Sequence, residues 1–324
     1  MPSRLARLSA LTLAALVPLS VGCKDQDRSA PSRISSSEAA RADSPGVSTG
    51  AVTSDPVAPV VSYGDAEAAF TGGRYTEATE LFGSFTEANP DNAWGHYMLG
   101  LAAWKSGEHE RAMEGFDQAL RLDPGHRKSL FNSARVLLET RRPKKGLERI
   151  ERALAIEPLS GEGLRLLARA RHEMGQVPQA IEGYQRAIAL DQRDAWAMNN
   201  LGLIYIQQGR YDAALPPLAR AVELRGNAPV FQNNLGTALE RSGHTAAARQ
   251  AYEAVLAVDS TYSKASVALT RITELGDQVT DSTVDVSALS REFQQQIAQW
   301  QDSTAASDST TVGLTVEDSA HGGL

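Results

Sequence analysis

The chain has 324 residues, of which 42% are apolar and 22% charged, with a net charge of −7 from 32 basic and 39 acidic residues. The absence of a basic surplus argues against nucleic acid as a partner. A single cysteine excludes an internal disulfide framework and a cysteine-based zinc site. The negative charge lies mainly in residues 277–324, which hold eight acidic residues and one basic residue.

The N-terminus has the pattern of an export signal. Arg4 and Arg7 precede an apolar run from Leu8 to Leu19, and small residues lead from its end to Cys23. This order of charged start, short apolar middle and small residues predicts a cleaved secretory signal over residues 1–22. The apolar run is shorter than the ~20 residues that a membrane-spanning helix needs.

The only cysteine, Cys23, follows the small pair Val21-Gly22 at the end of this run. The arrangement resembles the bacterial lipobox, and the resemblance implies that Cys23 becomes the lipidated first residue of the mature protein. Lys24 directly after it favours the outer membrane, on its periplasmic side. The alternative is removal of the signal by an ordinary signal peptidase, with Cys23 playing no part.

Residues 23–58 form the predicted linker that follows the anchor. They are rich in Ser, Ala, Pro, Gly and Asp and show no helical or strand period. Such a segment cannot bury enough apolar surface to become ordered. About 35 flexible residues span roughly 33 Å on average, which is enough to hold a folded domain clear of a lipid surface.

A 34-residue period runs through the middle of the chain, and such a period indicates stacked helical repeats. One position of the period carries glycine in five of six copies, with Arg141 in the remaining one. The five are Gly73, Gly107, Gly175, Gly209 and Gly243. A second position carries small residues: Ala78, Ala112, Gly146, Ala180, Ala214 and Ala248. A third carries large apolar ones: Phe82, Phe116, Ile150, Tyr184, Leu218 and Tyr252.

These residues resemble the tetratricopeptide repeat (TPR), whose two antiparallel helices follow the pattern W-x2-L-G-x2-Y…A-x3-F…P. Leu201-Gly202, Tyr205, Ala214 and Ala221 match that pattern in the fifth copy. The resemblance implies an all-α fold, a right-handed α-α superhelix over residues 59–276. Its units are expected at 59–92, 93–126, 127–160, 161–194, 195–228 and 229–262, with a capping helix at 263–276.

In resembling proteins the first helix of each unit lines a concave groove, and the matching positions here differ in character along the array. The second unit offers the aromatic side chains of Trp94, Tyr97 and Trp104. The third and fourth units offer a mainly basic set: Lys128, Asn132, Arg135, Arg165 and Arg169. The fifth and sixth units offer Trp196, Asn200 and Asn234.

The three asparagines share one repeat position, where a side-chain amide can both donate to and accept from an extended peptide. Met98 and Leu166 interrupt this row, and the alternative is that the amides are solvated or bond to local backbone. The basic set only partly resembles the carboxylate clamp of chaperone-binding TPR domains, because Phe131 stands where that clamp has lysine. The alternative is a charged face that keeps the protein soluble.

Catalytic motifs are missing from the sequence. The six histidines show no metal-ligand spacing, and neither a nucleophile elbow nor a phosphate-binding glycine loop is present. We therefore expect no catalytic residues, no metal and no cofactor.

The segment 277–324 is rich in Ser, Thr, Asp and Gln, which predicts an acidic disordered tail. Within it, apolar residues recur with the spacing of one helical face and predict a short amphipathic helix at 285–301. They are Val286, Leu289, Phe293, Ile297 and Trp300. We expect this helix to dock in the groove beside Trp94 and the basic set, or else to remain a solvated appendage.

The sequence as a whole predicts a protein–protein interaction scaffold or adaptor of the bacterial cell envelope, and not an enzyme. Its partners would be other envelope proteins, bound as peptides or helices in the groove, and the membrane, bound through the lipid on Cys23. Two alternatives stay open: a pilot-type lipoprotein of secretion or pilus assembly, and a substrate adaptor for a separately encoded enzyme.

Overall fold

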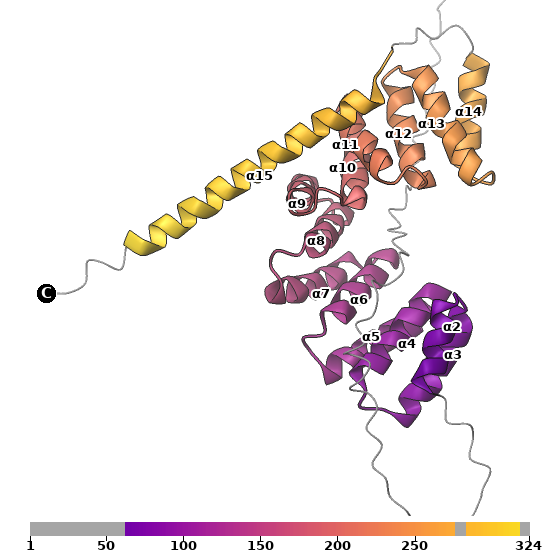
Figure 1. Cartoon of the computed structure of the whole chain (residues 1–324), viewed down its shortest axis with the longest axis vertical. Helices are drawn as coiled ribbons and strands as arrows, with labels where there is room; N and C mark the ends of the chain where they lie inside the picture. Colours follow the sequence, from indigo (N-terminus) through magenta and orange to yellow (C-terminus); the bar gives the residue numbers. More distant parts are fainter. Residues whose placement is uncertain (1–61, 276–282, 318–324) are drawn as a thin grey trace, which may run out of the picture.

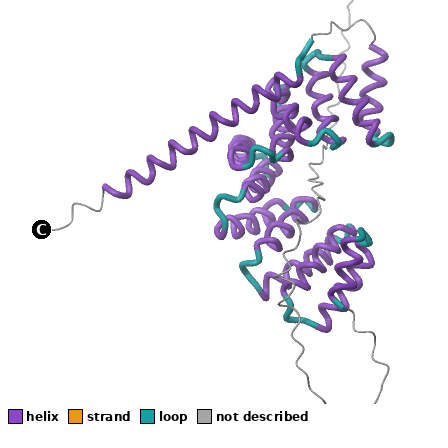
Figure 2. The backbone as a smooth tube through the Cα atoms, in the orientation of Figure 1, coloured by secondary structure: helices purple, strands orange, loops and turns teal. Residues whose placement is uncertain are grey.

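The computed structural model describes residues 62–275 and 283–317, and it describes side chains as far as Asp302, except that of Leu275. The described residues form the helices α2 to α15 and contain no strand (Figures 1 and 2). The fold is therefore an all-α superhelix, as the 34-residue period predicted. The signal, Cys23 and the linker lie outside the described residues.

Six helix pairs and a capping helix make up the array. The first helices of the pairs are α2 (Tyr63–Thr71), α4 (Ala93–Ser106), α6 (Arg127–Glu139), α8 (Gly161–Glu173), α10 (Ala195–Gln207) and α12 (Pro229–Arg241). The second helices are α3 (Tyr75–Ala88), α5 (His109–Leu122), α7 (Pro143–Ile156), α9 (Val177–Leu190), α11 (Tyr211–Leu224) and α13 (Thr245–Val258). The capping helix is α14 (Ser263–Leu275), and α15 (Val286–Glu317) follows it.

The turn inside each pair needs one residue in the left-handed region, which glycine adopts without steric cost. Five turns have glycine there, with φ between 71° and 92°. In the third unit Arg141 takes the same conformation at φ 59° and is the only described non-glycine residue with positive φ. The turn geometry is therefore kept although the sequence departs from the glycine pattern.

The two helices of a pair approach closely because small residues face large ones. A Cβ atom on Gly115 would lie 2.6 Å from the backbone nitrogen of Gly100, and one on Gly202 would lie 2.5 Å from Leu218. The large apolar positions of the period are almost fully buried between the helices: Phe82, Phe116, Ile150, Tyr184, Leu218 and Tyr252. The core is thus a continuous series of these contacts and has no single centre.

The array has two different sides. First helices of neighbouring units contact one another directly, as α4 does with α6, α6 with α8, and α10 with α12. Each second helix contacts the first helices on either side of it. We call the side formed by the first helices the inner surface, and the side formed by the second helices the outer surface.

The helix α15 packs on the outer surface, against α11 and α9, and then runs away from the array (Figure 1). The prediction that the tail helix would dock in the groove beside Trp94 was therefore wrong. Its apolar face is complementary to the space between two second helices, where Phe293 and Ile297 become buried. The helix also continues to Glu317, beyond the expected 285–301.

Candidate functional site: the inner surface

An aromatic cluster forms the N-terminal part of the inner surface. The indole nitrogen of Trp94 donates a hydrogen bond to the Tyr63 hydroxyl at 2.7 Å. The Trp94 ring lies 5.0 Å from that of Tyr97, and the ammonium of Lys128 lies 4.7 Å from the centre of the Trp94 ring. Trp94 is half-buried and Lys128 exposed, so this pair presents an aromatic face with a cation above it.

A chain of polar contacts leads from this cluster to the next two first helices. The Asn132 amide donates to the Tyr97 hydroxyl at 3.3 Å, and Arg135 donates to the Asn132 oxygen at 2.7 Å. Arg135 also forms an ion pair with Glu162 at 2.8 Å. Burial raises the pKa of Tyr97 to about 12, so its hydroxyl stays neutral and acts as the acceptor. The chain links α4, α6 and α8.

Trp104 lies apart from this chain, near the C-terminal end of α4. Its indole nitrogen donates to the Glu139 carboxylate at 2.9 Å, and the same carboxylate lies 3.5 Å from the His109 ring nitrogen. Only 9% of Trp104 is exposed. The structure thus gives Trp104 a contact between units and does not place it beside Trp94.

The basic residues of the fourth unit are paired with carboxylates. Arg165 binds Asp194 at 2.9 Å, and Arg169 binds Glu173 at 3.0 Å. Both arginines are almost completely buried, where an unpaired charge would carry a large desolvation cost. The basic stretch expected in the sequence is therefore largely neutralised within the protein.

Amide side chains and a tryptophan form the C-terminal part of the inner surface. The Asn234 amide donates to the Asn199 oxygen at 2.9 Å, and the Asn199 amide donates to the Asn200 oxygen at 3.3 Å. Trp196 packs edge-on against Phe231 with ring centres 4.8 Å apart. Among the described residues, the Trp196 indole nitrogen and the Asn200 amide nitrogen are buried donors without a hydrogen-bond partner.

The predicted groove residues are thus mostly buried. Trp94 is half-buried and Lys128 is exposed, and the other nine are buried: Tyr97, Trp104, Asn132, Arg135, Arg165, Arg169, Trp196, Asn200 and Asn234. Their polar atoms connect neighbouring units more than they face solvent. Their partners Tyr63, Glu139, Glu162 and Asp194 were not predicted from the sequence. A signal for such partners was present, because several interacting pairs lie 35 residues apart.

The described residues contain no group of three His, Cys, Asp or Glu side chains placed to hold a metal ion. They also contain no helix that is both long and apolar enough to cross a membrane.

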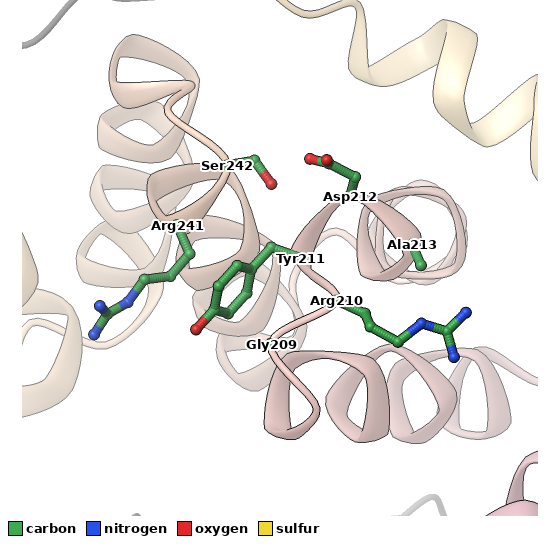
Figure 3. A pocket seen from close by; sticks show the side chains of 7 residues that line it. All are labelled: Gly209, Arg210, Tyr211, Asp212, Ala213, Arg241 and Ser242. Carbon is green, nitrogen blue, oxygen red and sulfur yellow. The ribbon is translucent and has the colours of Figure 1, made fainter.

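A cavity of about 430 Å³ lies at the edge of the array, where the turn between α10 and α11 meets the end of α12 (Figure 3). Its lining includes none of Trp196, Asn200 and Asn234, the predicted groove residues of the fifth and sixth units. Arg210 points away from Tyr211 and Arg241 (Figure 3), and its guanidinium lies 4.5 Å from the Tyr205 ring. The cavity is therefore a feature of the turns and not part of the inner surface.

Comparison with solved structures finds other superhelices of this kind. The chain is 18% identical to the APC/C hetero-tetramer Cut9–Hcn1, covering 64% of this chain and 41% of that one with a TM-score of 0.58. A tetratricopeptide repeat protein of Parabacteroides merdae is 12% identical, with 64% and 81% covered and a TM-score of 0.56. A thermophilic TPR protein of Thermus thermophilus, TTC0263, is 22% identical, with 57% and 100% covered and a TM-score of 0.50. At these identities the likeness shows the fold.

Family models identify the repeats themselves. Comparison with proteins of curated function gives no match. Models described as TPR repeat or tetratricopeptide repeat match residues 63–127, 103–170, 168–209 and 195–228. These matches together run from residue 63 to residue 228 without a gap and fall on the helix pairs α2 to α11. The chain therefore belongs to the tetratricopeptide repeat family.

Proposed function

We propose that this protein is an interaction scaffold that binds a peptide or helical segment of a partner protein on its inner surface. The supporting observation is the pair of half-buried Trp94 and exposed Lys128 beside a row of hydrogen-bonding side chains from successive first helices. An aromatic face and a cation bind an apolar and acidic segment, while amides bind a peptide backbone. The assembly of the fold relative Cut9 with Hcn1 is consistent with such a role.

Burial supports one location for the ligand. Because the arginines of the fourth unit are paired internally, the entry point for a partner is the N-terminal part, at Trp94 and Lys128. The two buried donors of α10, on Trp196 and Asn200, provide a second point, where each could donate a hydrogen bond to a carbonyl oxygen of the partner. Neither point has the group of reacting side chains that catalysis needs, so we propose a binding protein and not an enzyme.

A variant pair tests this assignment. Trp94→Ala with Lys128→Ala should reduce partner recovery from detergent-solubilised envelopes at least about tenfold, as loss of an aromatic anchor does in other interfaces. Leu159→Ala is the matched control, since Leu159 is 72% exposed in the loop between α7 and α8. If the double variant and Leu159→Ala recover equal amounts of partner, the inner surface is not the binding site.

We also propose that Cys23 carries the lipid that attaches the scaffold to the cell envelope, with residues 24–58 as the tether. The support is the charged, apolar and small-residue order that ends at the single cysteine. Cys23→Ser should move the protein from the membrane fraction to the soluble periplasmic fraction. Unchanged partition, with no lipid on the mature N-terminus in a mass spectrum, would reject the anchor.

Two narrower functions rest on the same surface: a pilot protein for an envelope channel, and a substrate adaptor for a separate enzyme. A pilot protein needs the anchor, whereas an adaptor does not. If Cys23→Ser still binds its partner but no longer supports assembly of the envelope channel, the result would favour the pilot protein. If the variant still delivers substrate to the separate enzyme, the result would favour the adaptor.

A further inference from the structure

The helix α15 completes the core of units four and five from the outer surface. Phe293 and Ile297 are each only 1% exposed, and Ser290 is 2% exposed. Leu289 and Trp300 are partly buried at the two ends of the same face. The apolar side chains therefore follow spacings of four, four and three residues, which place them on one side of a helix.

Polar contacts fix the position of α15 along the array. The Ser290 hydroxyl donates a hydrogen bond to the Glu223 carboxylate on α11. At the other end, the Gln301 amide donates to the backbone oxygen of Ala189 at 2.7 Å, and Gln192 donates to the Gln301 oxygen at 2.8 Å. Specific hydrogen bonds at both ends of an apolar strip distinguish a fitted site from unspecific hydrophobic contact.

The outer contact and the inner surface share one apolar cluster. Phe293 and Ile297 enter the cluster that also holds Tyr184 between the helices and Trp196 and Phe231 on the inner side. Packed interiors transmit a loss of volume to their neighbours. What occupies the outer surface of α9 and α11 therefore affects the part of the inner surface formed by α10.

The docked part of α15, residues 286–302, gains stability from this contact. The segment 286–302 has 17 residues, and an isolated helix of about this length is marginal in water. Its folding is therefore coupled to its binding. An attached segment of this kind has an effective local concentration in the millimolar range, so it occupies the site even when its intrinsic affinity is modest.

We infer that the outer surface of α9 and α11 is a second binding site, separate from the inner surface, which takes an amphipathic helix, and that α15 is its occupant in the free protein. Occupancy of this site stabilises the α10 part of the inner surface. The inference does not depend on the identity of any inner-surface ligand.

Hydrogen exchange of the full chain tests the linkage. Phe293→Ala with Ile297→Ala should release α15 and speed amide exchange in α15, α9, α10 and α11 at least about tenfold, as expected for two large-to-small core changes. Exchange in α4 and α5 should stay as in the wild type. Gln295→Ala, on the exposed side of α15, is the matched control and should change none of these rates.

A synthetic peptide of residues 283–302 tests whether the surface is a site in its own right. Added to the double variant at about millimolar concentration, it should restore slow exchange in α9, α10 and α11 in a saturable manner. The same peptide with both alanine substitutions should restore nothing. The inference is overturned by wild-type exchange of α10 in the double variant, by faster exchange in all units alike, or by failure of the wild-type peptide to restore protection.

Discussion

The side-chain amide of Asn234 donates a hydrogen bond to the side-chain oxygen of Asn199 at 2.9 Å, and the two residues lie 35 positions apart. The same separation joins Asn132 to Tyr97, Trp104 to Glu139 and His172 to Gln207. A repeat of 34 residues places equivalent positions side by side on neighbouring first helices. Two residues that lie 35 positions apart, one more than the repeat length, are therefore neighbours on the inner surface. Their hydrogen bonds hold successive units in register.

Substitution of Asn199 tests how much these hydrogen-bonded pairs contribute to the free energy of unfolding. Asn199→Ala leaves the buried Asn234 amide without its acceptor, so we expect a loss of about 1–3 kcal/mol in the free energy of unfolding. Asn199→Ala with Asn234→Ala should cost less than the sum of the single changes. Urea denaturation of the four proteins measures both quantities. Strictly additive losses would show that the contact carries no coupling energy.

The approach of helices α4 and α5 depends on Gly115. A Cβ there would lie 2.6–2.8 Å from backbone atoms of Gly100 and His96, and backbone cannot move as a side chain does. Gly115→Ala should therefore lower the free energy of unfolding by about 1–3 kcal/mol or more. Gly161→Ala is the control, because its Cβ would lie 3.7 Å or more from its neighbours. An equal effect of both substitutions in thermal unfolding would contradict the packing argument.

Arg141 carries local backbone strain. Its φ of 59° is a region that costs an ordinary L-residue roughly 1–2 kcal/mol and glycine little. Since glycine also loses more chain entropy on folding, Arg141→Gly should raise the free energy of unfolding by about 0.5–1 kcal/mol. Arg142→Gly is the comparison and should not stabilise. A lower midpoint for Arg141→Gly would show that the arginine side chain outweighs the strain.

His172 gives the stability a dependence on pH. Burial lowers its pKa from 6.5, although the hydrogen bond to Gln207 acts in the opposite direction. A folded-state pKa below the unfolded value means that the folded protein binds the proton less well. The stabilising contribution is therefore present above pH 6.5 and is lost as the pH falls from there to the folded-state pKa.

The variant His172→Gln should remove this part of the pH dependence. Unfolding midpoints of the wild type and the variant should converge or cross as the pH falls from about 7.5 to 5. Parallel midpoint curves over this range would mean that His172 titrates alike in both states.

The 34-residue period was sufficient to predict the helix pairs, because each position of the period has one local task. Glycine closes the turn, alanine permits close approach and a large apolar residue fills the gap, as Gly209, Ala214 and Leu218 do in one unit. The pairing and burial of the polar groove residues could not be predicted from single positions of the repeat. Arg165 is neutralised by Asp194, which directly precedes α10 of the next unit and caps that helix through Ala197.

The docking of α15 was also beyond the local pattern. Its spacing predicted an amphipathic helix, but the groove and the outer surface both offer apolar contacts, and only the three-dimensional structure distinguishes them. The decisive contacts join residues 67 to 112 positions apart, as between Ser290 and Glu223 or Gln301 and Ala189. The acidic tail appeared complementary to the groove because Arg165 and Arg169 were assumed to be unpaired. The structure pairs both arginines with carboxylates of the array.

Hydrogen exchange of the complex with a purified partner tests directly whether the inner surface binds partner proteins. The partner is recovered from solubilised envelopes, and amide exchange is compared between the free chain and the complex. We expect slower exchange in α4 and α6, around Trp94 and Lys128, and loss of that protection in Trp94→Ala with Lys128→Ala. Protection confined to second helices such as α5 and α7, or unchanged by these substitutions, would contradict it.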